Sequence, residues 1–291
     1  MTEFQINCGK FQLDLGNRTC IMGILNVTPD SFSDGGEFNE YDEAVAQGIR
    51  LAEQGAHILD IGGESTRPFS KPVSAQEEID RVVPVIDTLS RKINIPISID
   101  TLKSTVAKAA LDAGACIIND ISACEMDPDM MDVAARYQVP VVLMHMKGTP
   151  ETMQANPVYD DLIQEITDYL AARAESAIAK GIEKSRIILD PGIGFGKTGH
   201  HNLSLIQCLE SIVGLGFPVL MGPSRKSFIR TILSEKSTGT GGTPQVSSEQ
   251  IEIGTLAAVG ACLTHGAHII RVHDVHRAAA FTRVFDAIRN A

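Results

Sequence analysis

The 291-residue sequence contains no tryptophan, and aromatic residues make up only 5% of it. An aromatic-rich surface on which single-stranded nucleic acid could stack is therefore not expected. Positive charge is also scarce, because 25 lysines and arginines stand against 36 aspartates and glutamates, giving a formal net charge of −11. This balance argues against sequence-independent binding of nucleic acid. It does not exclude a local basic pocket for an anionic substrate.

Signals of zinc binding, secretion and membrane insertion are missing as well. None of the six cysteines forms a CxxC pair, and no cysteine–histidine set has zinc spacing. The first residues, MTEFQINCGKFQLDL, resemble no signal peptide, and no run reaches the roughly 18 apolar residues of a membrane span. We therefore expect a cytoplasmic protein with no membrane partner. The hydrophobic fraction of 44% is enough for a full folded core.

Short apolar runs recur along the chain, and each ends in a polar residue or glycine. Their nearly continuous apolar character is typical of parallel strands that are covered on both faces. The sequence of helix, Gly-Ala and strand occurs three times, in QGAHILD, AGACIIND and HGAHIIR. The eight runs are 21–25, 58–61, 95–99, 116–118, 139–144, 187–189, 219–221 and 268–272.

Helical patterns lie between these runs. The clearest four are 42–54, 74–92, 101–112 and 160–180. The second begins SAQEE, which predicts a capping box in which Ser74 and Glu77 bind each other's backbone N–H groups.

Eight strands that alternate with helices predict an α/β fold, a single (β/α)8 TIM barrel. An open, doubly wound sheet is the alternative, because its strands and helices alternate in the same way. Residues 4–15 alternate apolar and polar side chains, which predicts a short N-terminal β-hairpin, within residues 1–18, at the lower end of the barrel. No linker is visible, so residues 1–291 are expected to form one domain. A Gly/Thr/Ser-rich loop is expected at 235–248.

Polar residues stand at the carboxyl ends of nearly all the expected strands, where the active site of such a barrel forms. Asp100, Asn119 and Asp190 each end an apolar strand directly, so each should be largely buried and in need of a hydrogen-bond partner. Together with Lys226, they would match a flat heterocycle with amino and ring N–H donors beside a carbonyl. Asp190 could accept two parallel hydrogen bonds from a guanidine-like edge. Taken singly, each residue could equally be a helix cap or a loop residue.

Three further positions suggest an anion and a metal. Arg271 and His273 close the last strand two positions apart, so they should point to the same face and could grip an anion. The alternative is a salt bridge from Arg271 to Asp274 or a neighbouring acid. Asn26, at the end of the first strand, either binds a hard cation such as Mg²⁺ or caps the following turn.

Two long, turn-rich loops, 26–36 and 62–72, are of the kind that form mobile lids. The run GIGFGK at 192–197 lacks the GxxxxGK[ST] spacing of a nucleotide-binding loop, so no nucleotide is expected there. A Schiff base on Lys226 is an alternative role for that lysine, but no residue pattern identifies a carbonyl substrate.

Taken together, the strand-end segments resemble the dihydropteroate synthases, pterin-binding enzymes of the bacterial folate pathway. They lie in the family's order over nearly the whole chain, and the first two are highly specific. The matching runs are MGILNVTPDSFSDGG (22–36), DIGGESTRP (60–68), ISIDT (97–101), IINDIS (117–122), LMHMKGTP (143–150), ILDPGIGFGK (188–197), GPSRKSFI (222–229) and HIIRVHDV (268–275).

The resemblance implies a transferase that joins 6-hydroxymethyl-7,8-dihydropterin diphosphate to p-aminobenzoate, in an SN1-like reaction that gives 7,8-dihydropteroate and pyrophosphate. It also implies Mg²⁺ as cofactor, sulfonamides as inhibitors and a homodimer. Two alternatives remain: a pterin-binding paralogue without synthase activity, and a pterin-dependent methyltransferase domain. Arg271, His273 and the STRP loop argue against the methyltransferase, which has no diphosphate to hold.

The resemblance also assigns roles to individual residues. The pterin would be held by Asp100, Asn119, Met144, Asp190, Phe195 and Lys226. The diphosphate would be held by Asn26, Thr66, Arg271 and His273, with Asn26 as the Mg²⁺ ligand. The p-aminobenzoate would lie against Phe32, Thr66, Arg67, Pro68 and Ser224. The catalytic set would be Asp34, Asp100, Lys226, Arg271 and His273.

Overall fold

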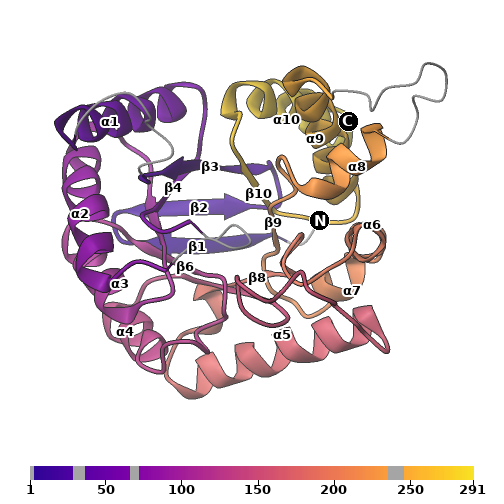
Figure 1. Cartoon of the computed structure of the whole chain (residues 1–291), viewed down its shortest axis with the longest axis horizontal. Helices are drawn as coiled ribbons and strands as arrows, with labels where there is room; N and C mark the ends of the chain where they lie inside the picture. The colour runs from indigo at the N-terminus through magenta and orange to yellow at the C-terminus, as the bar shows by residue number, and fades with distance from the viewer. Residues whose placement is uncertain (1–2, 29–36, 66–71, 235–245) are drawn as a thin grey trace.

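The computed structural model describes residues 3–28, 37–65, 72–234 and 246–291. Its centre is a parallel eight-stranded sheet in the order β8-β7-β6-β5-β4-β3-β10-β9, surrounded by helices (Figure 1). The strands are β3 (Cys20–Asn26), β4 (Ile58–Gly62), β5 (Ile97–Asp100), β6 (Ile117–Asp120), β7 (Val141–Met144), β8 (Ile187–Asp190), β9 (Leu220–Met221) and β10 (Ile269–Val272).

The two edges of this sheet meet between β8 and β9. An isolated parallel bridge joins Leu189 to Val219, and the backbone N–H of Leu189 donates to the carbonyl of Pro218 at 2.9 Å. The sheet therefore closes on itself. The predicted (β/α)8 barrel is confirmed, and the open doubly wound sheet is wrong.

The helices cover the outside of the barrel. They are α1 (Glu37–Glu53), α2 (Ala75–Lys92), α3 (Ser104–Asp112), α4 (Met130–Tyr137), α5 (Leu162–Ala179), α6 (Gly199–Gln207), α7 (Glu210–Val213), α8 (Ser227–Ser234), α9 (Ser248–Thr264) and α10 (Val275–Arg289), with a 3₁₀ turn, η2, at Lys184–Arg186. Ser74 caps α2 by accepting the N–H of Glu77 at 3.2 Å. The carboxylate of Glu77 pairs with Arg81 on the next turn instead of returning to Ser74, so the predicted capping box is only half formed.

Side-chain alternation along the strands builds the interior in layers, because every second residue points into the barrel. A lower layer is apolar and buried; it contains Met22, Ile58, Ile117, Val142, Ile188, Leu220 and Ile269. Two positions further along five of these strands stand Asp60, Asn119, Met144, Asp190 and Arg271. The fold therefore places a polar layer directly above an apolar one, at the carboxyl ends of the strands.

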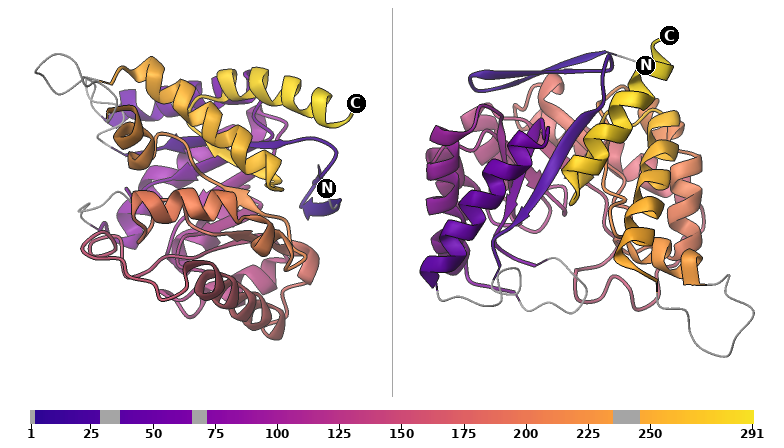
Figure 2. Two further views of the ribbon diagram at one scale, coloured as in Figure 1. Left: turned by 90° about the vertical axis from the view of Figure 1, so that its right-hand side faces the viewer. Right: turned by 90° about the horizontal axis from the view of Figure 1, so that it is seen from above.

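The lower end of the barrel is closed by the antiparallel hairpin of β1 (Phe4–Cys8) and β2 (Phe11–Leu15). The buried side chains of Ile6, Cys8, Leu13 and Leu15 pack against the lower apolar layer. Figure 2 shows the hairpin lying across one end of the barrel, with the end of α10 beside it. The predicted hairpin and its position are confirmed.

The end of the chain is tied to the same lower face. Asp286 of α10 accepts hydrogen bonds from the backbone N–H and the hydroxyl of Thr19, both at 2.8 Å. Asn290 donates to the carbonyl of Asn17 at 3.0 Å. The last helix is thus fixed to the segment that leads into β3.

No helix within the described ranges has the length and apolar content needed to cross a bilayer.

Candidate active site

Arg271 lies between two carboxylates in the upper layer of the barrel. Its Nε donates to Oδ2 of Asp60 at 2.6 Å, and its Nη2 donates to Oδ2 of Asp100 at 2.7 Å. The amide nitrogen of Asn119 donates to the same Asp60 oxygen at 3.1 Å. Strands β4, β5, β6 and β10 are therefore joined by one polar network above the apolar layer.

The alternative of a salt bridge from Arg271 to Asp274 or a neighbouring acid is confirmed for neighbouring acids, and Asp274 has another partner. Asp274 caps α10 by accepting the N–H of Arg277 at 2.9 Å, and it pairs with the Arg277 guanidinium at 3.2 Å. The acids that bind Arg271 are Asp60 and Asp100. Asp60 was not among the predicted site residues. The sequence feature that could have indicated it is its position as a charged residue inside the apolar strand ILDIG.

Burial and crowding of carboxylates disfavour the ionised form of Asp100. Burial raises the pKa of Asp100 to about 7, while the Arg271 guanidinium opposes this rise. The carboxylates of Asp60, Glu78 and Asp120 act in the same direction as burial. A ligand that brings positive charge or N–H donors to this carboxylate would therefore favour its ionised form.

A second group of predicted residues meets at the end of β8. Met144 and Asp190 are register partners on β7 and β8, and both are buried. Oδ1 of Asp190 accepts the N–H of Gly192 at 2.7 Å. The ammonium of Lys226 lies 4.0 Å from the centre of the Phe195 ring, a cation–π contact. Asp100 and Asn119 are likewise register partners, on β5 and β6.

The pKa values of Asp190 and Lys226 are strongly shifted from their ordinary values. Burial raises the pKa of Asp190 to about 6, against the effects of the Gly192 N–H and of Lys226, Lys197 and Arg271. Burial also lowers the pKa of Lys226 to about 8, and Arg271 lowers it further. Such shifts from burial together with specific charged neighbours are typical of binding and catalytic sites.

These values predict a pH-dependent stability for Asp190→Asn. Because the pKa of Asp190 is raised to about 6, the folded protein binds this proton more tightly than the unfolded chain. Loss of the proton from Asp190 in the wild-type protein therefore lowers its free energy of unfolding as pH rises from about 4 to about 6. Without ligand, the variant should be more stable than wild type by about 3 kcal/mol at pH 7, and by about half of that at pH 5. Urea unfolding at both pH values measures this, and an equal difference at both would contradict it.

His273 and Ser224 lie side by side at the ends of β10 and β9. Nδ1 of His273 is 2.9 Å from the Ser224 hydroxyl, which also accepts the backbone N–H of His273 at 3.2 Å. One residue of the predicted diphosphate set thus touches one of the predicted p-aminobenzoate set. Asn26 ends β3, opposite Gly62 of β4, and is half-buried. Because β3 lies between β4 and β10, Asn26 belongs to the same rim.

Five predicted residues, Phe32, Asp34, Thr66, Arg67 and Pro68, lie outside the described residues.

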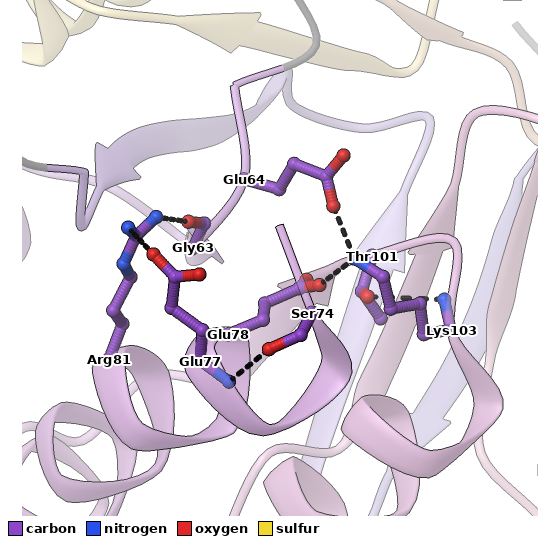
Figure 3. Close-up of polar contacts among 8 residues, drawn as sticks. All are labelled: Gly63, Glu64, Ser74, Glu77, Glu78, Arg81, Thr101 and Lys103. Carbon is purple, nitrogen blue, oxygen red and sulfur yellow. Dashed lines mark hydrogen bonds and ion pairs between the residues drawn. The ribbon is translucent and has the colours of Figure 1, made fainter. Parts of the chain in front are cut away.

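The described start of the second predicted loop is held by α2 and by the start of α3 (Figure 3). The ammonium of Lys103 pairs with Glu64 and, at 2.6 Å, with the fully buried Glu78. Arg81 donates to the carbonyl of Gly63 at 2.8 Å. The backbone that follows β4 is therefore fixed as far as Glu64.

Removing Lys103 should be costly because it leaves the Glu78 carboxylate buried without its partner. We expect Lys103→Met to lower the free energy of unfolding by about 2 kcal/mol, less than for a fully buried pair because the Lys103 side chain is 25% exposed. Urea unfolding provides the measurement. Lys103→Met combined with Glu78→Gln should recover part of the loss, and a single variant as stable as wild type would contradict this interpretation.

Comparison with known proteins agrees with this geometry. Residues 22–273 match the model of the pterin binding enzyme family. The chain is 46% identical over 280 residues to the dihydropteroate synthase of Synechocystis sp., covering 96% of this chain and 93% of the relative. The dihydropteroate synthase of Xanthomonas albilineans, solved with 4-aminobenzoic acid, has a TM-score of 0.90 at 42% identity, covering 100% of both chains. That of Yersinia pestis, solved in a sulfonamide drug complex, has a TM-score of 0.89 at 40% identity, covering 99% of this chain and 100% of the other.

These relatives are similar over nearly the whole chain, and each carries the same name. They leave the alternative of a pterin-dependent methyltransferase without support. The chain belongs to the family of pterin-binding enzymes and, within it, to the dihydropteroate synthases.

Proposed function

We propose that this enzyme condenses 6-hydroxymethyl-7,8-dihydropterin diphosphate with p-aminobenzoate, which yields 7,8-dihydropteroate and pyrophosphate. The observation that supports this most is the meeting of two carboxylates, an amide and an ammonium group in the upper layer of the barrel. Asp100 and Asn119 are register partners, and Asp190 ends β8 where Lys226 covers the Phe195 ring. This is the donor and acceptor pattern that the edge of a pterin requires.

Each polar group of this set has a role that its chemistry allows. Asp190 accepts two hydrogen bonds from the amino group and ring N–H of the pterin while it is ionised. The amide nitrogen of Asn119 already donates to Asp60, which leaves its oxygen to accept from the pterin. Lys226 donates to the ring carbonyl or a ring nitrogen. Met144 and Phe195 form apolar walls for the flat ring.

The diphosphate would lie against Arg271 and His273, with Thr66 as a further donor. Because Asp60 and Asp100 hold the guanidinium at two nitrogens, its position is fixed before the substrate arrives. Fixed positive groups aimed at the leaving oxygens stabilise the charge that develops on them.

Asn26 would be the protein ligand of Mg²⁺. The fit follows from the donor chemistry: Mg²⁺ usually keeps several waters and substrate phosphate oxygens, so one neutral amide oxygen at the rim is sufficient. The described ranges hold no group of three or more His, Cys, Asp or Glu side chains arranged as a metal cage, which agrees with a metal held mainly by the substrate. When bound, Mg²⁺ supplies further positive charge to the diphosphate.

The reaction would follow an SN1-like path. The bond between the pterin methylene carbon and the diphosphate oxygen breaks first, and pyrophosphate carries away the electron pair. The methylene cation is favoured by the carboxylates of Asp100 and Asp34. The neutral arylamine nitrogen then attacks the carbon and loses its proton. Exclusion of water matters because water would otherwise capture the cation.

The p-aminobenzoate would lie against Ser224 and against Phe32, Thr66, Arg67 and Pro68. The complexes of the relatives with 4-aminobenzoic acid and with a sulfonamide drug support p-aminobenzoate as the second substrate and make sulfonamides the expected competitors.

We also infer a homodimer. The groove between α6, α8 and α9 is lined mostly by apolar residues, and Leu203, Ile232 and Ile253 on these helices are exposed large hydrophobic residues. A second copy of the chain would cover this surface. Sedimentation analysis at micromolar concentration measures the mass, and a monomer would contradict the inference. One domain over residues 1–291 and a cytoplasmic location remain predictions.

The test of the activity is pyrophosphate release from dihydropterin diphosphate with Mg²⁺, with and without p-aminobenzoate, while dihydropteroate is followed in parallel. We expect one dihydropteroate for each pyrophosphate. Pyrophosphate without dihydropteroate would mean that the cation forms and that the arylamine site is defective. Neither product from a folded protein that binds the pterin would favour the paralogue without synthase activity.

A further inference from the structure

The segment from Gly192 to Lys197, which follows β8, is fixed by side chains from several parts of the chain. Asn202 accepts the N–H of Gly194 at 2.8 Å, and Gln154 donates to the carbonyl of Gly194 at 2.7 Å. The hydroxyl of Tyr159 donates to the carbonyl of Gly196 at 2.7 Å. This segment carries Phe195, so these contacts help to set the position of the aromatic wall.

Gly192 brings this segment close to β7. Its φ of +72° lies in the left-handed region, and a Cβ atom there would collide with the carbonyl oxygen of His145. The glycine thus allows the turn after Asp190 to pack directly on the backbone that follows Met144.

Lys197 ends the segment with a buried ammonium group. Its side chain is only 2% exposed, yet its Nζ forms no ion pair within the described part of the chain. It lies 3.0 Å from the carbonyl oxygen of Phe195, 3.3 Å from that of His145 and 3.0 Å from Nδ1 of His145. An ammonium group has three hydrogens and no acceptor, so three acceptors around Nζ satisfy it. The contacts join the end of β7 to the Phe195 segment.

The charges around Lys197 agree with this arrangement. Burial lowers the pKa of Lys197 to about 7; Asp190 opposes this change and Lys226 adds to it. Burial, followed by the Lys197 charge, lowers the pKa of His145 to about 3, so its ring is neutral and Nδ1 can accept. The groups that lower the pKa of Asp190 against its burial are the Gly192 N–H, Lys226, Lys197 and Arg271.

We propose that Lys197 is a positioning residue of the pterin site, which holds the carbonyl groups of His145 and Phe195 together and provides a buried positive charge for the Asp190 carboxylate. This inference rests on the proposed function, because Asp190 is the residue that would bind the pterin. Lys197 would act through the backbone of Phe195, whose carbonyl its ammonium group contacts, and through Asp190. Its charge keeps Asp190 in the ionised form that can accept two N–H groups.

The test is the dissociation constant of 6-hydroxymethyl-7,8-dihydropterin between pH 5.5 and 8, measured by calorimetry. In wild type, affinity should fall as pH falls, because Asp190 becomes protonated. Lys197→Met and Lys197→Gln remove a positive charge, which raises the pKa of Asp190 and should move the midpoint of this loss upward by roughly one pH unit. At pH 5.5, where Lys197 is charged, both variants should bind about eightfold more weakly than wild type, and at pH 7 only about twofold more weakly.

Two controls separate this role from a purely structural one. Lys147→Met removes the same charge from an exposed lysine nearby, which pairs with Glu165 at 3.2 Å, and should leave the midpoint unchanged. Lys197→Arg keeps the charge, so it should keep the wild-type midpoint even if its larger side chain weakens binding.

The outcomes are distinguishable. A midpoint equal to that of wild type in Lys197→Met or Lys197→Gln would overturn the proposal. If neither neutral variant folds, a shifted midpoint in Lys197→Arg would overturn it, and an unchanged one would support it. Absence of pterin binding by wild type at every pH would overturn the proposed function and this inference with it.

Discussion

Asp190→Asn is expected to lower kcat/KM for the dihydropterin diphosphate by about 10²- to 10³-fold. Asparagine keeps the shape of the side chain and an oxygen that can accept the Gly192 N–H. It replaces the other oxygen with an NH₂ group, which would face N–H donors of the pterin. The variant thus removes the charge from both hydrogen bonds and sets its NH₂ group against one of the two pterin donors, together about 3–4 kcal/mol.

Steady-state kinetics with dihydropterin diphosphate as the varied substrate measures this effect. The KM for p-aminobenzoate should stay within about threefold of the wild-type value, because that site uses other residues. The variant should also be folded and, without ligand at pH 7, more stable than wild type, so unfolding would not explain the loss. A kcat/KM within tenfold of wild type would contradict the assigned role of Asp190.

Arg271→Met is expected to cause the largest loss of stability, about 4 kcal/mol. The reason is that Asp60, fully buried, and Asp100 would lose the cation that both carboxylates bind. Breaking a buried pair by removing one partner is far more costly than breaking an exposed one, which typically contributes less than about 1 kcal/mol. Urea unfolding of the ligand-free protein at pH 7 measures the difference.

Arg277→Met is the matched control, because Arg277 pairs with Asp274 at 3.2 Å and its side chain is 48% exposed. It should change the free energy of unfolding by less than about 1 kcal/mol. Asp60→Asn added to Arg271→Met should recover part of the stability, since the residues are directly coupled. If the two arginine variants were equally stable, the carboxylate network would not be a structural element of the barrel.

The barrel could be predicted from the sequence because its strands are buried on both faces. A parallel strand between helices and a filled interior is an uninterrupted apolar run, as in Val141–Met144. The starts of strands were predicted less well: the run 95–99 was expected, but β5 begins at Ile97. Pro96 has no backbone N–H for the sheet, although its carbonyl accepts the N–H of Leu59 at 3.0 Å.

Site residues could be predicted from the sequence only where a charged or amide side chain stands directly at the end of an apolar strand. Asp100, Asn119 and Asp190 stand at such ends, and alternation places them in one layer. Asp60 was missed because its partner Arg271 is 211 positions away in the chain, and nothing in the sequence pairs them. Lys197 was missed for a different reason. Its partners are two backbone carbonyls and a neutral ring nitrogen, so no oppositely charged residue in the sequence indicates its role.

The ties of Thr19 to Asp286 and of Asn17 to Asn290 have a practical consequence for handling the enzyme. They hold the last helix at the hairpin end of the barrel, and the described start of the chain, Glu3, leads into that same hairpin. A sensor surface or bead attached through either end of the chain would therefore lie under the barrel, and the rim with Asp190 and Arg271 would face the solution. Substrate and drug binding could then be followed on immobilised enzyme without the support covering the site.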